Sequence, residues 1–258
     1  MARVFITGSA DGLGFMAAEL LLERGHEVVL HARTKDRADQ VKEKISRGTP
    51  VVVGDLSHVS QMKNVAEQAN RLGPFDAIIH NVGVGYREPY RIETEDGLSH
   101  VFAVNVLAPY VLTALIKKPK RLIYLSSLLH DAAEIDIDDL SWSIRNWDGM
   151  KAYSESKFMD ALLSRAVARL WPDVLVNALE PGWVQTKMGG EQANDDLSQG
   201  HLTQVWLAEG LDPATHVTGG YFYHLQRREM DTRAGDLTLQ TRLLDFCQKV
   251  SGIVLPGR

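Results

Sequence analysis

Short runs of apolar residues alternate along this chain with longer stretches in which apolar residues recur every three or four positions. The short runs predict six β-strands, at Val4–Ile6, Glu27–His31, Val51–Val53, Ala77–His80, Leu122–Leu125 and Val174–Ala178. The longer stretches predict helices at Phe15–Arg24, Arg37–Ser46, Gln61–Leu72, Gly97–Lys117 (kinked at Pro109) and Tyr153–Leu170. Strands that are apolar nearly throughout and separated by helices indicate a parallel sheet covered on both faces. We therefore predict an α/β fold, a doubly wound parallel sheet with helices on both faces, in a single domain spanning residues 1–258.

Two segments interrupt this alternation. Residues 128–151 are acidic and contain tryptophans, and residues 187–215 are polar and glycine-rich before they become helical. Each follows a strand at the edge where open α/β sheets bind ligands, so we expect an excursion at 128–151 and a substrate lid at about 187–215. The side chains expected to line a pocket there, each equally compatible with an ordinary core position, are Trp142, Trp147, Trp183, Trp206, Met188, Leu197 and Leu202.

Composition narrows the functional classes. Apolar residues make up 45% of the 258 residues and charged residues 24%, as in an ordinary globular protein, and the net charge of −5 disfavours non-specific nucleic-acid binding. The single cysteine, Cys247, excludes an intramolecular disulfide and a cysteine-rich zinc site, and its simplest interpretation is a small apolar residue on a C-terminal helix. We expect no metal. Neither a signal peptide nor a run of about 18 apolar residues is visible, so we expect a cytoplasmic protein without a membrane anchor.

The first predicted strand runs into a glycine-rich turn, Thr7–Gly14, which is followed at once by a helix. In such a turn Gly8 permits the tight bend, Gly12 lets the backbone approach a pyrophosphate, and Gly14 allows close packing of the helix on the strand. The free N–H groups at the start of the helix then face the anion. This strand–turn–helix context predicts a Rossmann-type dinucleotide site rather than a plain turn.

The end of the second strand carries the signal for cofactor preference. A carboxylate there binds a ribose 2′-hydroxyl, whereas an arginine suits a 2′-phosphate. Here Arg33 stands at the tip and no carboxylate does. We therefore expect NADP(H) in preference to NAD(H), which stays possible. The alternative is that Arg33 and Lys35 are only solvated loop charges.

A phenol and an ammonium, Tyr153 and Lys157, are spaced to lie one helical turn apart on the same face. A free tyrosine has a pKa near ~10, and a neighbouring positive charge lowers it towards the range useful for proton transfer. Such a pair alone is also compatible with two exposed surface side chains that have no catalytic role. Further polar groups follow the strands or interrupt an apolar helix, each also explicable as a cap, a turn or a satisfied amide: Asn105, Ser126–Ser127, His80–Gly83 and Pro181–Thr186.

Taken in order and spacing, these motifs resemble those of the short-chain dehydrogenase/reductase family, of the compact single-domain type, and the resemblance covers nearly the whole chain. Ser126–His130, the acidic stretch ending at Leu140, and Tyr153 are similar to the retinol-dehydrogenase-like and WW-domain-oxidoreductase-like branch. The segment Gly219–Phe222 and a terminal helix at Thr238–Val250 fit the same branch.

The resemblance implies a catalytic role for four residues. Tyr153 would be the acid/base, Lys157 would lower its pKa and hold the nicotinamide ribose, and Ser127 would position the substrate oxygen. Asn105 would support a water that connects Lys157 to solvent. Trp183 and Met188 are the expected substrate contacts.

The resemblance also implies the cofactor contacts. Asp55 would meet the adenine, Asn81 and Gly83 would pass along the adenosine ribose, and Val184 and Thr186 would meet the nicotinamide carboxamide and the phosphates. The remaining expected contacts, besides Tyr153, Lys157 and Arg33, are Gly8, Ser9, Asp11, Gly12, Leu13, Gly14, Leu56, Val82, Pro181 and Gly182.

The chain departs from the family pattern in several places. His80 replaces an asparagine and Val82 an alanine, and the stretch between Ser127 and Tyr153 is longer than in the shortest members. The apolar N-terminal anchor of the membrane-associated relatives is not visible, which puts membrane-dissolved substrates such as retinoids in doubt.

The expected function is hydride transfer between NADP(H) and the carbonyl or alcohol carbon of a small, apolar substrate, with Tyr153 as acid/base. The alternative is a non-catalytic NADP(H) sensor or scaffold on the same fold, although a sensor would not need Ser127. Nucleotide-sugar epimerisation or dehydration is a further alternative, but such relatives usually carry a larger C-terminal domain. We expect a homodimer or homotetramer paired through the Gly97–Lys117 and Tyr153–Leu170 helices, although the same faces would also serve to pack on the sheet.

Overall fold

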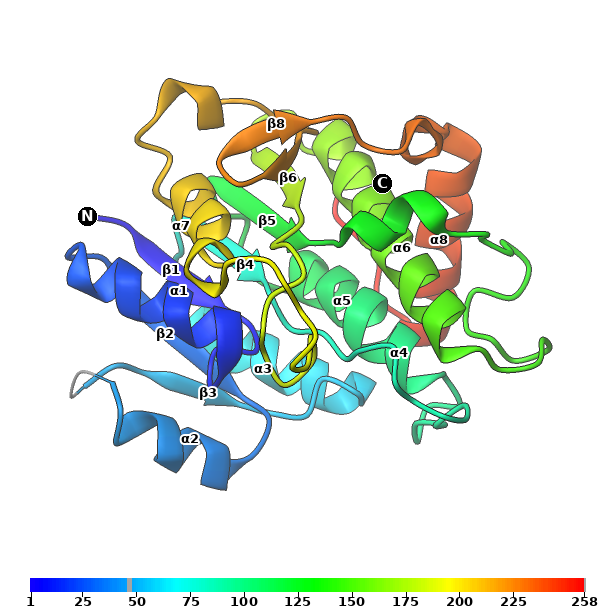
Figure 1. Ribbon diagram of the computed structural model, residues 1–258, viewed down its shortest axis with the longest axis horizontal. Coiled ribbons are helices and arrows are strands. Elements are labelled where there is room, and N and C mark those ends of the chain that lie inside the picture. The colour runs from blue at the N-terminus through cyan, green and yellow to red at the C-terminus, as the bar shows by residue number, and fades with distance from the viewer. Residues whose placement is uncertain (46–47, 258) are drawn as a thin grey trace.

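Eight strands form one sheet in the order β3-β2-β1-β4-β5-β6-β7-β8, and all neighbours are parallel except the last pair (Figure 1). The computed structural model describes residues 1–45 and 48–257. The chain starts in the middle of the sheet, winds outward to β3, returns to β4 beside β1, and then winds outward in the other direction. The predicted doubly wound α/β architecture is confirmed, and the crevice of such a sheet lies where β1 and β4 diverge.

The strands are short, as the apolar runs of the sequence require. Their bounds are β1 Arg3–Ile6, β2 Glu27–Ala32, β3 Val51–Val53, β4 Ala77–His80, β5 Arg121–Leu125, β6 Leu175–Leu179, β7 Tyr221–Tyr223 and β8 Gln226–Arg228. The α-helices are α1 Gly12–Glu23, α2 Lys35–Lys42, α3 Val59–Leu72, α4 His100–Phe102, α5 Ala108–Leu115, α6 Gly149–Leu170, α7 Leu202–Glu209 and α8 Leu237–Ser251. Short 3₁₀ turns include η2 Leu128–Ala132, η3 Leu197–Gln199, η4 Pro213–Thr215 and η5 Thr232–Gly235.

Two apolar layers sandwich the sheet. On one face α1, α2 and α7 bury residues such as Leu21, Val41 and Val205 against the strands. On the other face α3, α5, α6 and α8 form a larger cluster, to which Phe158 and Leu243 belong. Figure 1 shows α8 lying along α6 on the side away from the sheet. Both faces of the sheet are thus covered, which explains why its strands are apolar in successive positions rather than alternate ones.

Two predicted helices differ from the observed ones. The helix predicted at Arg37–Ser46 begins at Lys35, because the Thr34 side chain caps it by accepting from the Arg37 N–H, and it ends at Lys42; Ser46 lies outside the described residues. The stretch predicted as one helix at Gly97–Lys117 is three segments, α4, a π-helical turn η1 at Ala103–Leu107, and α5.

The irregularity in this stretch is the wider π turn η1, which comes just before Pro109, and Pro109 lies in the first turn of α5. A kink at Pro109 stays a prediction. The π turn contains the buried Asn105.

The carboxyl-terminal quarter adds structure beyond the six predicted strands. β7 pairs with β6, and β8 folds back antiparallel to β7 at the edge of the sheet. Helix α8 covers the outer face of α6, and Cys247 on it is buried, as predicted. The tail beyond α8 is fixed by Tyr110, whose hydroxyl donates to the Ile253 carbonyl at 2.7 Å, and by Trp171, whose indole N–H donates to the Pro256 carbonyl at 2.7 Å.

The apolar faces of α5 and α6 are therefore buried within one chain. These are the faces expected from sequence to pair across a two-fold axis, and the alternative, that they serve internal packing, describes the structure. A dimer or tetramer stays a prediction. Within residues 1–45 and 48–257, no helix has the length and apolar character needed to cross a membrane. The same residues contain no cluster of three or more His, Cys, Asp or Glu side chains arranged to bind a metal.

Candidate functional site

A cavity of about 560 Å³ opens at the carboxyl ends of β5 and β6, at the sheet edge where open α/β sheets bind ligands. Its walls come from the loop after β4, the η2 turn, the start of α6, and the segment after β6. The residues that line it are Leu13, Tyr86, Ser126, Ser127, Leu128, Leu129, Met150, Tyr153, Glu180, Pro181, Gly182, Trp183, Val184, Thr186, Met188, Gly189, Asp195, Tyr223 and Arg228.

Tyr153 reaches this cavity from the first turns of α6. The helix begins at Gly149, earlier than predicted, because Asp148 caps it by accepting from the N–H groups of Met150 and Lys151. The Tyr153 side chain is 7% exposed, and its hydroxyl lies 3.9 Å from the sulfur of Met188. Its ring meets that of Tyr86 edge to face at 5.6 Å. The phenol is therefore held between the cavity and the helix rather than displayed on a surface.

Ser127 approaches the phenol from the end of β5. It caps the η2 turn, where its hydroxyl oxygen accepts from the Leu129 N–H at 3.3 Å, and its side chain lowers the pKa of Tyr153. The buried His130 donates from Nδ1 to the Ser127 carbonyl at 2.7 Å. The backbone on both sides of the serine hydroxyl is thus fixed, so its direction towards the cavity is set by the fold.

Lys157 lies one turn after Tyr153, and its Nζ is 5.8 Å from the centre of the Tyr153 ring. The side chain is 4% exposed, and Nζ donates to the Leu125 carbonyl and to Asp160 Oδ2, both at 2.8 Å. Burial lowers the pKa of Lys157, but the Asp160 carboxylate and the Tyr153 phenol raise it more, so the pKa stays above its ordinary value and the side chain is an ammonium.

The pKa of Tyr153 does not follow the prediction. Burial raises it above its ordinary value, and Asp160 raises it further. Lys157 acts in the expected direction and lowers the pKa, as does the hydrogen bond with Ser127, but together they do not offset the burial. The net effect is that the pKa of Tyr153 lies above its ordinary value.

Asn105 lies in the π turn beside this group. Its side-chain amide donates to the Val84 carbonyl at 3.1 Å and to Ser156 Oγ at 2.9 Å, and its oxygen accepts from the Val84 N–H at 2.8 Å. A Cβ atom added to Gly83 would lie 3.6 Å from the Asn105 oxygen and 3.7 Å from Lys157 Nζ. The asparagine thus joins the loop after β4 to α6 beside the lysine, and its suggested contact to a water stays a prediction.

The glycine-rich turn packs against the end of β4 without room for a side chain. A Cβ atom on Gly14 would lie 2.4 Å from Asn81 Nδ2 and 2.6 Å from the Gly8 carbonyl, and one on Gly8 would lie 2.9 Å from the Val82 Cα. Gly12 differs, because it has φ +56° and open space in front of it. The start of α1 therefore has open space at Gly12, and the N-terminus of a helix is a favourable place for an anion such as a pyrophosphate.

His31 on β2 stabilises this turn by hydrogen bonding. His31 Nδ1 accepts from the Gly8 N–H at 3.0 Å, and its Nε2–H donates to the Gly54 carbonyl at 2.9 Å. Burial lowers the pKa of His31 to about 4, so the ring is neutral, as its accepting Nδ1 requires. Ser9 is also buried and bonds only within the fold, to the Ile6 carbonyl and the His31 N–H, so its side chain does not face the crevice.

Charged residues gather at the two ends of the glycine turn. Arg33 is exposed after β2, and its charge acts on Asp55, whose carboxylate accepts from the Ser57 N–H and hydroxyl. Burial alone would raise the pKa of Asp55, but these hydrogen bonds and Arg33 leave it below its ordinary value. Leu56 beside it is buried, at 2% exposure.

Asp11, the N-cap of α1, pairs with two cations that were not predicted as site residues. Arg37 from α2 lies 3.0 Å from it, and Lys187 from the segment after β6 also contacts it. The signal that would have found these cations is their position: one follows β2 and the other begins the predicted lid.

The segment after β6 supplies the other wall of the crevice. Asp195 accepts from the Trp183 N–H at 2.6 Å and lies 2.8 Å from where a Gly182 Cβ would stand, so only glycine fits at that position with its φ of +85°. Thr186 Oγ1 accepts from the Gly189 N–H at 3.1 Å. Six residues expected from the sequence to contact cofactor or substrate line the cavity: Pro181, Gly182, Trp183, Val184, Thr186 and Met188.

Three of the four tryptophans predicted to line the cavity do not. Trp142 and Trp147 pack against each other at 5.7 Å, and Trp206 packs on Phe222 at 5.6 Å. Leu197 and Leu202 are also absent from the cavity wall. Their places are taken by side chains that the sequence did not single out, namely Tyr86, Leu128, Leu129, Met150, Glu180, Asp195, Tyr223 and Arg228. Glu180 is buried and pairs with Arg228, so β8 reaches across to the end of β6.

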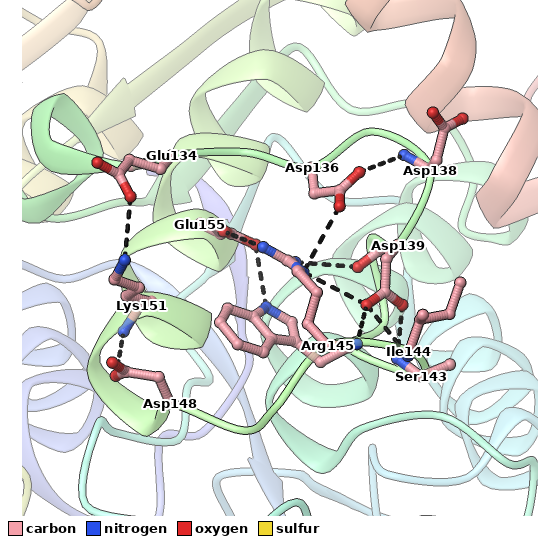
Figure 2. Close-up of polar contacts among 12 residues, drawn as sticks. Glu134, Asp136, Asp138, Asp139, Ser143, Ile144, Arg145, Asp148, Lys151 and Glu155 are labelled. Carbon is pink, nitrogen blue, oxygen red and sulfur yellow. Dashed lines mark hydrogen bonds and ion pairs between the residues drawn. The ribbon is translucent and has the colours of Figure 1, made fainter.

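The excursion at 128–151 is fastened to α6 by a buried ion-pair network (Figure 2). Both Arg145 terminal nitrogens donate to the Glu155 carboxylate at 2.9 Å, and the Trp142 indole N–H donates to the same carboxylate at 3.0 Å. Asp139 accepts from the N–H groups of Ser143, Ile144 and Arg145 and holds the loop in shape. Glu155 lies two residues after Tyr153, so this network fixes the start of the helix that carries the phenol.

Similar sequences share the pattern of this site. A family model described as short chain dehydrogenase matches residues 2–122. The short-chain dehydrogenase chry4 of Gibberella zeae is 41% identical over 261 residues, and chyC of Penicillium rubens is 42% identical over 263 residues; each comparison covers 100% of both chains. Retinol dehydrogenase 13 of Homo sapiens is 33% identical over 285 residues, which cover 98% of this chain and 86% of the relative.

Solved structures share the fold. A crystal structure of a protein from Mycobacterium Paratuberculosis superposes with a TM-score of 0.85 at 24% identity, over 99% of this chain and 95% of the other. A blue fluorescent protein from a metagenomic library, in complex with NADPH, superposes with a TM-score of 0.68 at 22% identity, over 86% and 95% of the two chains. At these identities the likeness concerns the fold alone.

Proposed function

The chain belongs to the short-chain dehydrogenase/reductase family, and on this premise we propose that it is an NADP(H)-dependent oxidoreductase of carbonyl or alcohol substrates, with Tyr153 as acid/base. One observation carries the proposal: Tyr153 and Ser127 line one cavity at the carboxyl edge of the sheet, and the Lys157 Nζ lies 5.8 Å from the centre of the Tyr153 ring. Members of the family bind nicotinamide cofactors.

The glycine turn supports the cofactor part of this proposal. Of the three glycines in the turn, only Gly12 has space for a Cβ atom, and it lies at the N-terminus of α1. This open position suits a dinucleotide pyrophosphate. Arg33 would bind a 2′-phosphate, which favours NADP(H) over NAD(H), and Asp55 would meet the adenine. The segment at Val184 and Thr186 would hold the nicotinamide end. When bound, the reduced nicotinamide supplies the hydride.

The chain's own residues would handle the oxygen and its proton. Ser127 and Tyr153 donate hydrogen bonds to the substrate carbonyl oxygen and stabilise the negative charge that develops on it. Tyr153 then gives its proton to that oxygen, and its phenolate recovers a proton from solvent by way of the group around Lys157 and Asn105. The Lys157 ammonium would also hold the nicotinamide ribose.

The cavity favours an apolar substrate. Leu128, Leu129, Met150, Trp183 and Met188 form most of its wall near the phenol. The Glu180–Arg228 pair is the polar group at the β8 end. Residues 187–215 would act as the lid, since the first part of this segment covers the cavity and Lys187 reaches Asp11. A cytoplasmic location and a homo-oligomeric state stay predictions.

Replacing Tyr153 with phenylalanine tests the proposal. Tyr153→Phe is expected to lower the rate of NADPH-dependent carbonyl reduction by about 100-fold or more, because the proton donor is lost, while NADPH binding followed by fluorescence stays nearly intact. Tyr90→Phe, at a phenol that is 66% exposed, is the matched control.

Near-normal turnover in Tyr153→Phe would remove the tyrosine from the mechanism. NADPH binding without consumption, across a broad panel of ketones, aldehydes and quinones, would instead favour the non-catalytic sensor.

A further inference from the structure

A carboxylate is buried next to the site lysine, and no step described so far uses it. Asp160 lies on α6, three residues after Lys157, and is 2% exposed. Its Oδ2 accepts from Lys157 Nζ at 2.8 Å, whereas its Oδ1 is buried without a hydrogen-bond partner among the described residues. A buried carboxylate oxygen without a donor is costly, so a group held in this way calls for an explanation beyond packing.

The carboxylate fixes where the ammonium points. Lys157 Nζ has three protons, and two of them are given to the Asp160 carboxylate and the Leu125 carbonyl. The third is left for the side of Tyr153 and Gly83, whose Cβ position would lie 3.7 Å from Nζ. A flexible lysine side chain is thereby held in one orientation.

The carboxylate also compensates the charge of the ammonium. Of the groups that act on Tyr153, Lys157 and Asp160 are the charged ones, with opposite effects on its phenol. The facing groups on neighbouring elements are neutral or engaged elsewhere: Tyr86 meets the phenol ring, Tyr124 on β5 is bonded to Thr113, His80 on β4 is bonded to Thr113, His130 to Ser127, and Arg233 to Asp231. The lysine thus meets the phenol as half of an ion pair rather than as an isolated cation.

We propose that Asp160 is a positioning residue that holds the Lys157 ammonium and compensates its charge, so that Tyr153 stays a proton-bearing phenol and the site is biased towards carbonyl reduction. This inference rests on the proposed function. Burial and Asp160 both raise the pKa of Tyr153, in keeping with the geometry.

The bias follows from the proton balance of the two directions. In reduction the C=O π bond breaks, carbon takes a hydride with its two electrons from the reduced nicotinamide, and oxygen takes the Tyr153 proton. The phenol is then the competent form. In oxidation the alcohol proton must go to a phenolate, so a site that keeps the phenol protonated at neutral pH has little of the form that oxidation needs.

The closing experiment measures the phenol first without substrate or cofactor. Phenolate formation by Tyr153 is followed by ultraviolet difference absorbance against Tyr153→Phe, in the parent chain and in Asp160→Asn. The near-isosteric amide removes the charge, so phenolate is expected to appear at least about one pH unit lower in the variant. Asp160→Ser removes the same charge with a smaller side chain and serves if the amide variant does not fold. The proposal is overturned if the titration curves of the parent chain and Asp160→Asn coincide while both proteins stay folded. This includes the case in which neither protein forms phenolate at Tyr153 over the pH range.

A second arm measures the direction of catalysis. In Asp160→Asn, the ratio of kcat for alcohol oxidation to kcat for carbonyl reduction, each at saturating substrate and cofactor and at neutral pH, is expected to rise about tenfold, and the pH profile of oxidation to move to lower pH with the phenolate. Glu155→Gln is the matched control, because it removes a buried carboxylate from the same helix that pairs with Arg145 rather than Lys157. An unchanged ratio, or an equal shift in the control, overturns the role of Asp160.

The two arms separate this proposal from the function it rests on. Full turnover in Tyr153→Phe would defeat the proposed function while the phenolate titration of the unliganded chain still judges Asp160. If activity does require Tyr153 but phenolate forms at the same pH in Asp160→Asn as in the parent chain, only the role of Asp160 is defeated.

Discussion

The two walls of the crevice are built in different ways. On the nucleotide side, backbone meets backbone: Gly14 approaches the Gly8 carbonyl and Asn81, and there is no space for one more carbon atom. On the substrate side, mostly apolar side chains line the cavity, and ion pairs hold the segments that carry them: Arg145 joins Glu155 behind the wall, and Arg228 joins Glu180 at its edge. The comparison teaches that the first wall depends on the absence of side chains and the second on the presence of particular charges.

The largest effect is expected on the nucleotide wall. In Gly14→Ala the added carbon would lie 2.6 Å from a backbone oxygen that cannot rotate away, so the turn must shift. We expect a loss of about 3 kcal/mol in the free energy of unfolding, measured by denaturant titration, and NADPH binding weakened by about 100-fold or more.

Gly12→Ala is the matched control for that prediction. Gly12 has a φ of +56° but nothing within 4 Å of its Cβ position, so the substitution costs only the strain of the left-handed conformation, about 1 kcal/mol. NADPH binding should still fall, because the methyl group enters the space of the pyrophosphate. Equal loss of stability in the two variants would contradict the tight packing inferred for Gly14.

A smaller loss is expected on the substrate wall. Glu155→Gln removes the charge that both Arg145 nitrogens contact and leaves a guanidinium that is only 24% exposed. We expect a loss of about 2 kcal/mol in the free energy of unfolding, read from the same titration. Lys151→Ala, which breaks the exposed pair with Glu134 seen in the same view (Figure 2), should leave the free energy of unfolding nearly unchanged. Equal losses of free energy of unfolding in Glu155→Gln and Lys151→Ala would mean that burial of the Arg145–Glu155 pair does not add to its stabilising effect.

The smallest effect is expected at the exposed end of the nucleotide wall. Arg33→Ala should weaken NADPH binding about tenfold and leave NADH binding nearly unchanged, because only NADPH carries the 2′-phosphate. Fluorescence titration with the two cofactors measures both values. Equal losses for NADPH and NADH would assign Arg33 to the solvated loop charges instead.

The contrast between the walls also explains what the sequence predicts. The family and the doubly wound sheet are confirmed, because apolar strands and a glycine turn are local features whose meaning hardly depends on distant residues. The similarity to retinol dehydrogenases is confirmed as well. The strands β7 and β8 were missed because three residues each, Tyr221–Tyr223 and Gln226–Arg228, are too short for a periodic signal.

The site divides in the same way. The positions of Tyr153 and Ser127 at one cavity, with Lys157 beside the phenol, follow from strand ends and a helical spacing, and the structure brings these residues together. The upward direction of the Tyr153 pKa did not follow, because it depends on burial and on Asp160. The Lys157–Asp160 spacing is a local signal and was open to prediction. Trp142 and Trp147 were misplaced because the path of residues 128–151 is set by the contacts of Arg145, which pattern alone does not reveal.

The edge strand β8 has a consequence for how copies of the molecule meet. An uncovered sheet edge is a template on which further strands add, and long apolar edges lead to aggregation. Here the outermost strand is three residues long, runs against its neighbour, and carries Arg227 and Arg228. The charges of these arginines oppose the addition of a like strand. Arg228, which lines the cavity, therefore also protects the exposed edge of the sheet against aggregation.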